Sequence, residues 1–308
     1  MIAVTGANGF VGAAVVQALA GAGHAVRPVT RHAVPGSVAV GDIGPKTDWS
    51  AALNGVDAVV HCAARVHVMN ETAADAMAAF RAVNAEGARR LAQQCAGAGV
   101  KRLVLVSSIK VNGEATKPGR PFRANDAPAP QDAYGQSKWE AEQALWNVCE
   151  QTGLEGVVVR PPLVYGPGVR ANLARLMRLI ETGLPLPLGG IHNRRSLVAL
   201  GNLSHLLVRC TQHPSAAGKT FLVSDAQDLS TPELIRHLAD ALGRPARLLP
   251  VPIGLLRLAG HITGHTAEVA RLVDSLEVDS TATRAELDWT PPLAVAEGLK
   301  TMVQGGRA

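Results

Sequence analysis

Two side chains in the middle of the sequence have the types and spacing needed to move a proton. Tyr134 and Lys138 stand four residues apart in the segment Tyr-Gly-Gln-Ser-Lys, and residues at this spacing share one face of a helix. A tyrosine has a pKa near 10, so serving as a base near neutral pH needs a decrease of roughly 3 units, or about 4 kcal/mol. A cation about 4 Å away at an effective dielectric constant of ~20 supplies about that much. The pair therefore predicts a phenol made acidic by its lysine neighbour, unless the spacing arose by chance on an ordinary helix.

A glycine-rich turn near the N-terminus predicts a dinucleotide site. The segment Thr5–Gly12 reads Thr-Gly-Ala-Asn-Gly-Phe-Val-Gly and lies between an apolar run and a segment of helical periodicity. Gly6 permits a sharp exit from a strand, Gly9 lets a pyrophosphate approach the backbone, and Gly12 lets the helix pack closely on the sheet. The helix N-terminus then offers free N–H groups to the phosphates. The glycine spacing is one residue longer than the usual G-x-G-x-x-G, and three glycines in an ordinary turn are the alternative.

Two serines follow a later apolar run. Ser107 and Ser108 directly follow the apolar residues 103–106 and end that predicted strand. The carboxyl edge of a doubly wound sheet is where such a fold holds its ligand. A hydroxyl at that edge can donate to the substrate oxygen that exchanges a proton with Tyr134. A polar strand end or a helix cap is the competing interpretation.

Cofactor preference is predicted from the end of the second apolar run. NAD sites carry a carboxylate there for the ribose 2′-hydroxyl, whereas this chain has Val-Thr-Arg-His over residues 29–32. Arg31 is placed to meet a 2′-phosphate. The sequence therefore predicts a preference for NADP over NAD, with a solvated surface arginine as the alternative.

The elements that position these residues alternate along the first half of the chain. Strands are predicted at residues 2–5, 25–29, 38–40, 58–61, 103–107 and 157–160, and helices at 10–22, 49–53, 73–98 and 134–152. Asp132 is the expected N-cap of the last helix. Strands alternating with helices predict an α/β fold with a doubly wound parallel sheet, the Rossmann arrangement, covered on both faces.

The alternation of strand and helix patterns becomes irregular after Arg160, where prolines cluster. We expect a dinucleotide-binding domain over residues 1–160 and a smaller, mainly substrate-binding lobe over 161–308. The chain is expected to return to the first domain near 195–225, with a strand at 219–223. The most apolar stretch, Leu248–Ile262, is broken by prolines and is interpreted as a buried or lid segment rather than a membrane-surface helix.

Composition excludes several classes of protein. The chain has 308 residues, of which 47% are hydrophobic and 18% charged, which argues against disorder. A net charge of +5 without a block of like charges, together with 3% aromatic residues, does not indicate a nucleic-acid partner. The four cysteines are widely separated, so neither a disulfide framework nor a metal site is expected.

No apolar run reaches the ~18 residues of a membrane span and the start leaves no room for a signal peptide, so a cytoplasmic protein is expected.

Taken together, these residues resemble the extended short-chain dehydrogenase/reductase family, in the NAD-dependent epimerase/dehydratase branch that modifies nucleotide sugars. The resemblance covers nearly the whole chain. Its ordered blocks are Thr5–Gly12, Gly41–Asp42, Asp57–Ala64, Val83–Asn84, Val106–Gly113, Tyr134–Lys138, Arg160–Gly168, Val278–Ser280 and Arg284–Pro291.

The resemblance implies roles for individual residues. Ser108, Tyr134 and Lys138 would form the catalytic triad, with Lys138 also holding the nicotinamide ribose. Asp42 would contact the adenine. Together with the residues above, the other expected cofactor-binding positions are Gly6, Asn8, Gly9, Phe10, Val11, Gly12, Arg31, Ile43, Ala63, Ala64, Asn84, Ser107 and Pro161.

Substrate contacts are also implied by the resemblance. Arg195 aligns with an arginine that grips the diphosphate of a sugar nucleotide, although a surface salt bridge is its alternative. Asn172 and Arg271 are further candidates for the nucleotide-sugar pocket, and Ser108 would touch the sugar. Lys110 either steers an anionic substrate or is simply solvated.

Differences between this chain and the family pattern reduce the number of reactions that we expect. Relatives that dehydrate sugars carry an Asp-Glu pair where this chain has Ile109 and Lys110, so 4,6-dehydration is not expected. The segment 107–114 resembles bacterial enzymes that reduce a UDP-4-keto-6-deoxy-N-acetylhexosamine in polysaccharide biosynthesis, and this NAD(P)-dependent reduction at C4 is the first expectation. The same subgroup also contains UDP-hexose 4-epimerases that keep NAD tightly bound.

Two further functions are compatible with the same residues: a non-catalytic dinucleotide sensor on this fold, and a reductase of non-sugar carbonyls. The sugar, the nucleotide and the direction of the reaction are not specified by the sequence. The resemblance implies a homodimer that pairs through the helix carrying Tyr134 and the long helix before it.

Overall fold

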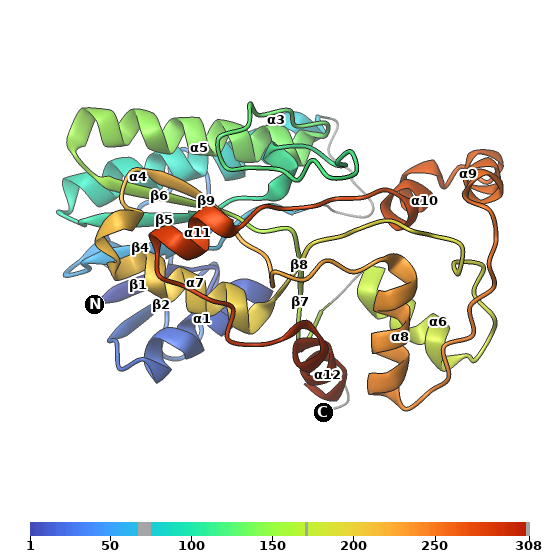
Figure 1. Cartoon of the computed structure of the whole chain (residues 1–308). Helices are drawn as coiled ribbons and strands as arrows, with labels where there is room; N and C mark the ends of the chain where they lie inside the picture. Colours follow the sequence, from blue (N-terminus) through green and yellow to red (C-terminus); the bar gives the residue numbers. More distant parts are fainter. Residues whose placement is uncertain (67–74, 170–171, 306–308) are drawn as a thin grey trace.

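A parallel sheet of seven strands forms the centre of the molecule (Figure 1). The computed structural model describes residues 1–66, 75–169 and 172–305. In spatial order the strands are β3 (Val38–Ala39), β2 (Val26–Thr30), β1 (Ile2–Thr5), β4 (Ala58–His61), β5 (Arg102–Val106), β6 (Glu155–Arg160) and β9 (Lys219–Leu222). All neighbouring pairs are parallel, which confirms the doubly wound α/β fold. The order reverses beside β1, and that switch point is where such a sheet opens a crevice for ligands.

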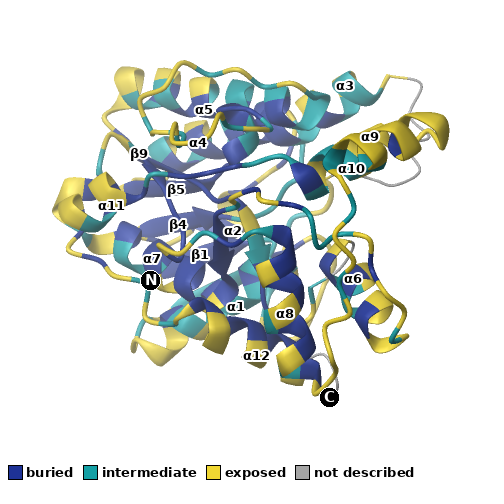
Figure 2. Cartoon of the chain, turned by 45° about the vertical axis from the view of Figure 1, so that its right-hand side comes forward, coloured by how far each residue is buried: buried dark blue, intermediate teal, exposed yellow. Residues whose placement is uncertain are grey.

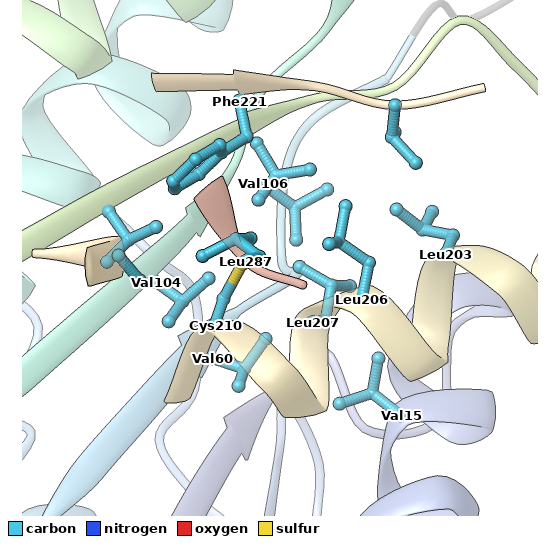
Figure 3. Close-up of a cluster of buried hydrophobic side chains, with 14 of the residues drawn as sticks. Val15, Val60, Val104, Val106, Leu203, Leu206, Leu207, Cys210, Phe221 and Leu287 are labelled. Atoms are coloured by element: carbon cyan, nitrogen blue, oxygen red, sulfur yellow. The ribbon is translucent and has the colours of Figure 1, made fainter. Parts of the chain in front are cut away.

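The inner strands β1, β4, β5 and β6 are almost continuously buried because helices cover both faces of the sheet, whereas β2 and β3 at one edge are only partly buried. One face packs against α1 (Phe10–Gly21) and α7 (Leu200–Gln212), and Figure 3 shows this core. The other face packs against α2 (Ser50–Leu53), α4 (Gly87–Gly97) and α5 (Ala133–Thr152). The edge strand β9 returns from the second half of the chain and brings Phe221 into the first of these cores.

The long helix expected over residues 73–98 is interrupted. Residues 73 and 74 lie outside the described part of the chain, and the rest forms α3 (Ala76–Phe80), a π-helical segment η1 (Arg81–Glu86) and then α4. Hydrophobic periodicity does not distinguish a π turn from an α turn over six residues, so the sequence predicted one continuous helix. Such wide turns are often found at functional sites.

A smaller lobe follows β6. It contains a two-stranded parallel sheet of β7 (Leu163–Tyr165) and β8 (Leu197–Ala199), and a core of its own. Its helices are α6 (Asn172–Glu181), α8 (Thr231–Leu242), α9 (Ile253–Ile262), α10 (Thr266–Val273) and α12 (Val295–Gly305). Short connecting elements complete the described chain: η2 (Ile109–Val111), η3 (Pro214–Ala216) and α11 (Thr281–Glu286).

The apolar stretch Leu248–Ile262 is not buried, contrary to that part of the expectation. Most of it forms α9, whose side chains are largely exposed, as Figure 2 shows. The sequence pattern misled because α9 is apolar on two sides, of which only one packs on a neighbouring helix. Within the described ranges, none of the helices combines the length and the hydropathy that crossing a bilayer requires.

Candidate active site

Most of the predicted site residues follow the carboxyl ends of the central strands. The glycine turn follows β1, Arg31 follows β2, Ala63 and Ala64 follow β4, and Ser107 and Ser108 follow β5. Pro161 follows β6, and Asp42 lies three residues beyond β3. Parallel strands bring these positions to one edge of the sheet, so segments far apart in sequence form one site.

The glycine turn is shaped by two close approaches of the backbone. Gly6 has φ +65°, and a Cβ there would lie 2.9 Å from the Ala63 backbone. A Cβ on Gly12 would lie 2.1 Å from the Gly6 carbonyl oxygen. Gly9 is the exposed N-cap of α1 and provides no side-chain cap, so the first N–H groups of the helix are available to an anion. These features fit the pyrophosphate of a dinucleotide.

A histidine that the sequence analysis did not single out anchors this turn. His61, at the end of β4, shares a 2.7 Å hydrogen bond between its Nδ1 and the Thr5 hydroxyl, and the Ala63 N–H donates to the same hydroxyl over 3.3 Å. Burial lowers the pKa of His61 to about 3, so the imidazole stays neutral. The triple His61–Thr5–Ala63 thus fixes the crossing of two chain segments on which the cofactor turn depends.

The start of α5 brings Tyr134 to the site. Asp132 caps the helix by accepting from the Gly135 N–H over 2.6 Å, which confirms the predicted N-cap. The Ser108 hydroxyl lies close enough to the Tyr134 hydroxyl to lower the pKa of Tyr134. The Phe80 ring meets the Tyr134 ring edge to face, with centroids 6.1 Å apart. The structure therefore brings together the proposed proton-transfer group and its hydroxyl neighbour.

The expected acidification of Tyr134 by Lys138 is not present in this structure. Burial raises the pKa of Tyr134 to about 12, the Ser108 hydrogen bond opposes that rise, and Asp132 adds to it. Lys138 instead donates from Nζ to the Val106 carbonyl over 2.8 Å. Helical spacing placed both residues on α5 but could not reveal the acceptor that a buried ammonium finds at a strand end.

Lys138 is itself tuned by its surroundings. Burial lowers its pKa to about 8, while the nearby Cys62 and Glu142 act in the opposite direction. Burial also raises the pKa of the Cys62 thiol to about 12, so that group stays protonated. The Lys138 ammonium is therefore the positive group of this buried cluster below pH 8.

Asn84 lies in the π-helical segment η1 and is buried. Its side-chain oxygen accepts from the Arg65 N–H over 2.8 Å, and its nitrogen donates to the Arg65 carbonyl over 3.0 Å and to the Ser137 hydroxyl over 2.9 Å. Asn84 thereby links the segment after β4 to the helix that carries Tyr134.

A buried ion pair beneath the site was also missed by the sequence analysis. Arg160 donates to both oxygens of Glu142, over 2.9 and 2.6 Å, and to the Asn112 side-chain oxygen over 2.9 Å. The exposed fractions of the two charged side chains are 4% and 0%. Glu142 lies one helical turn after Lys138, a spacing that could have indicated a shared face. Its partner Arg160, however, is the last residue of strand β6.

These interactions involve two residues with predicted contacts. The Ser107 hydroxyl donates to Glu142 and belongs to the buried network, and its contact with the cofactor stays a prediction. Lys110 was expected either to steer the substrate or to be solvated. Its ammonium is instead held by Glu114, over 2.7 Å, and by Asp132, so its charge is already neutralised.

Arg31 and Asp42 form an ion pair at the cofactor edge, and both side chains are exposed. The loop after β3 therefore places a carboxylate beside Arg31. Sequence adjacency to β2 alone could not show this pairing.

Two predicted substrate arginines lie near each other in the lobe. Arg195 donates to the Asp274 carbonyl over 3.0 Å. Burial lowers its pKa, the nearby Asp274 carboxylate raises it, and the charge of Arg271, on α10, lowers it. The Asp274 carboxylate thus lies beside the two arginines and partly offsets their charge. Asn172 begins α6 and is exposed, and the contacts of the described residues do not join it to the two arginines.

The remaining predicted positions differ in exposure. Asn8 is exposed, Phe10, Val11, Ile43 and Ala64 are partly buried, and Pro161 is buried. The Pro161 carbonyl accepts from the Ile109 N–H over 3.0 Å and so fixes the segment that follows Ser108.

Comparison with known proteins agrees with this geometry. The model of the NAD dependent epimerase/dehydratase family matches residues 2–224. The chain is 46% identical to a UDP-glucose 4-epimerase of Vibrio cholerae, covering 98% of this chain and 94% of that protein. It is 25% identical to an N-acetyl-alpha-D-glucosaminyl-diphospho-ditrans,octacis-undecaprenol 4-epimerase of Escherichia coli O157:H7, covering 98% and 94% of the two chains.

Among solved structures, MoeE5 in complex with UDP-glucose and NAD has the same fold, with a TM-score of 0.78 at 24% identity over 99% of this chain and 98% of that chain. The family match, the near full-length identity and the arrangement of the site lead to one conclusion: the chain belongs to the NAD-dependent epimerase/dehydratase family and is an enzyme of the extended short-chain dehydrogenase/reductase type.

Proposed function

We propose that this enzyme is a UDP-hexose 4-epimerase that keeps NAD bound between turnovers. The observation that carries the proposal is the contact of Ser108 with Tyr134 at the sheet edge, on the helix that also carries Lys138. The 46% identity to a UDP-glucose 4-epimerase favours this function over the reduction of a 4-keto sugar, which the sequence placed first. A dinucleotide sensor would not need a tyrosine held against a serine hydroxyl.

In the proposed reaction Tyr134 takes the proton from the sugar O4 hydroxyl and Ser108 orients that oxygen by hydrogen bonding; the positive charge of a bound oxidised nicotinamide would oppose the effect of burial on the Tyr134 pKa. NAD, held by the glycine turn, would supply the hydride chemistry at C4. Lys138 holds a positive charge near the site and keeps its side chain at the strand end through Val106. The 4-keto sugar then rotates in the site and presents its other face for reduction. Tyr134 returns the proton to O4, so protons and electrons balance over the cycle. The arginine pair of the lobe would bind the diphosphate of the substrate.

The test uses the protein as purified, without added cofactor. Nucleotide released by denaturation is identified by chromatography, and interconversion of UDP-glucose and UDP-galactose is followed by NMR. We expect stoichiometric NAD and conversion in both directions. Protein that carries no nucleotide, interconverts neither sugar, and consumes NADPH with a UDP-4-keto sugar would establish the reductase instead.

The Arg31–Asp42 ion pair determines our assignment of NAD rather than NADP. The Arg31 charge that suggested NADP is partly neutralised by Asp42, and the matching family model is described as NAD dependent. We predict that Asp42→Asn increases the affinity for NADP about tenfold, because one charge-assisted phosphate contact becomes available, while Arg31→Ala removes that gain. Titration calorimetry on protein stripped of nucleotide measures both effects. A wild-type preference for NADP that Arg31→Ala abolishes would instead support the assignment based on Arg31 alone.

Arg195→Ala is predicted to raise KM for the UDP-sugar by roughly 10- to 100-fold, the loss expected for a hydrogen bond to a charged group. The value of kcat should change less, because the diphosphate is distant from the reacting carbon. Arg194→Ala is the matched control, since the neighbouring Arg194 is exposed and is paired with Asp228 and Glu277. Equal KM values for both variants would exclude Arg195 from substrate binding.

A further inference from the structure

Lys110 connects the two chain segments that carry the proposed proton-transfer residues. It lies in η2, two positions after Ser108. Its ammonium donates to the carboxylate of Asp132, which lies two positions before Tyr134, and also to Glu114 over 2.7 Å. The Lys110 side chain therefore joins the segment after β5 to the first turn of α5.

The backbone of Lys110 sets the direction of the Ser108 hydroxyl. Ser108 is the N-cap of η2, and its Oγ accepts from the Lys110 N–H over 3.2 Å. A hydroxyl that accepts on one side keeps its own proton to donate on another. The contact with Lys110 thus leaves Ser108 as a donor toward the oxygen that it would orient.

The carbonyl of Lys110 is packed against the start of α5. A Cβ on Gly135 would lie 2.9 Å from the Lys110 carbonyl oxygen and 3.2 Å from Asp132 Oδ1, so the glycine permits this close approach. Asp132 uses its two oxygens separately. Oδ1 accepts from the Gly135 N–H over 2.6 Å, and Oδ2 accepts from the Lys110 ammonium. The cap of the helix that carries Tyr134 is therefore itself held by Lys110.

The charge of Lys110 also lies beside a group that disfavours proton removal from Tyr134. The Asp132 carboxylate raises the pKa of Tyr134, because a nearby negative charge destabilises a phenolate. A positive charge bound to that carboxylate acts in the opposite direction. Geometry and charge at Lys110 thus favour the same outcome.

We propose that Lys110 is a positioning residue for proton transfer, which keeps the Ser108 and Tyr134 hydroxyls at a fixed separation by joining Asp132 to the segment of Ser108. In this role Lys110 acts through its two partners rather than on the substrate. The inference rests on the proton-transfer roles under the proposed function, but not on which sugar is converted.

The first experiment compares two substitutions of Lys110. Lys110→Met keeps the length of the side chain without its charge, whereas Lys110→Arg can still donate to two carboxylates. We expect Lys110→Met to lower kcat about tenfold, because small misplacements of reacting groups are costly, while KM for the UDP-sugar and the content of bound nucleotide stay unchanged. Lys110→Arg should recover most of that loss.

Lys219→Met is the matched control. Lys219 also forms an ion pair, with Glu286 over 2.6 Å. It is the first residue of β9, so it lies at the amino ends of the strands, away from the site. Its substitution should leave kcat unchanged. Circular dichroism and thermal unfolding establish that all the variants are folded.

A double variant tests whether Lys110 acts through Asp132. Asp132→Asn removes the carboxylate, while asparagine still caps a helix well. If the two residues act as a unit, the effects of their substitutions are not additive. The variant Lys110→Met/Asp132→Asn should therefore have a kcat no lower than that of Lys110→Met alone.

NMR of protein labelled with ¹³C at tyrosine Cζ supplies a measurement that does not need turnover. Because the chain has two tyrosines, Tyr134 and Tyr165, two signals are expected, and Tyr165→Phe assigns them. Lys110→Met should move the Tyr134 signal and leave the Tyr165 signal in place. Lys110→Arg should leave both near their wild-type positions.

The proposal is overturned if Lys110→Met keeps the wild-type kcat, if Lys110→Arg loses as much as Lys110→Met, or if the losses in the double variant multiply. It is also overturned if the Tyr134 signal does not move in Lys110→Met. Failure of the proposed function is seen separately, in the wild type. If the wild type reduces a UDP-4-keto sugar instead of interconverting UDP-hexoses, the same ratios of kcat are measured in that reaction.

Discussion

Replacing Tyr134 with phenylalanine is expected to lower kcat by about 10²- to 10⁴-fold, the range that a positioned general acid–base group contributes. The variant loses the hydroxyl that contacts Ser108 but keeps the ring that packs edge to face on Phe80. The helix should therefore stay in place, and bound nucleotide should be retained at the wild-type level. Initial rates of sugar interconversion and the nucleotide content of the same preparation measure the two effects separately.

The second tyrosine of the chain offers the matched control. Tyr165 also donates a buried hydroxyl, to Asp225 over 2.6 Å, but it lies in the core of the lobe. Tyr165→Phe should lower stability and leave kcat per folded molecule unchanged. If Tyr134→Phe keeps full turnover, or if the two variants lose kcat equally, Tyr134 is not the proton-transfer group.

Replacing Glu142 with glutamine is expected to cost about 3–5 kcal/mol of unfolding free energy, because Arg160 would keep a buried charge without its partner. The double variant Glu142→Gln/Arg160→Met removes both charges and should recover much of that loss. Urea unfolding of the wild type and the two variants measures these differences. A loss below about 1 kcal/mol for the single variant, the size of a surface pair, would mean that the pair contributes little.

Glu142 should also be detectable in the pH dependence of turnover. Its charge favours the protonated form of Lys138, whose pKa burial has lowered to about 8. Since the ammonium is present below that pKa, wild-type turnover should fall as the pH rises past it. Without the carboxylate the Lys138 pKa moves lower still, so the fall should occur at lower pH in Glu142→Gln. A purely structural role for Glu142 would leave the position of the fall unchanged.

The features that the sequence predicted well are those set by local spacing and by strand ends. The glycine turn, the Asp132 cap and the Tyr134–Lys138 helix each depend on residues within a few positions of one another. Ser108 follows strand β5 and lies at the edge where the carboxyl ends of the parallel strands meet, next to Tyr134 at the start of α5. Local patterns of this kind are sufficient to predict the edge of a doubly wound sheet and the groups that gather there.

The features that the sequence did not predict depend on partners in distant segments. The acceptor of Lys138 is a backbone carbonyl, and nothing in residue types identifies it. Glu142 meets Arg160 from another element, and Asp42 reaches Arg31 from the loop after a different strand. These pairings require the register of the folded sheet, so they changed the interpretation of cofactor choice and of proton transfer.

The π-helical segment η1 has a consequence for how this chain tolerates insertions and deletions. A π turn holds about one residue more than an α turn, and one residue corresponds to about 100° of rotation in an α-helix. Deleting a single residue between Arg81 and Glu86 would convert the wide turn into a regular one and leave α3 and α4 in nearly their present rotation, whereas the same deletion within α3 or α4 would rotate the two parts of the helix by about that angle. The wide turn is therefore the part of this helix where the loss of one residue disturbs the flanking turns least.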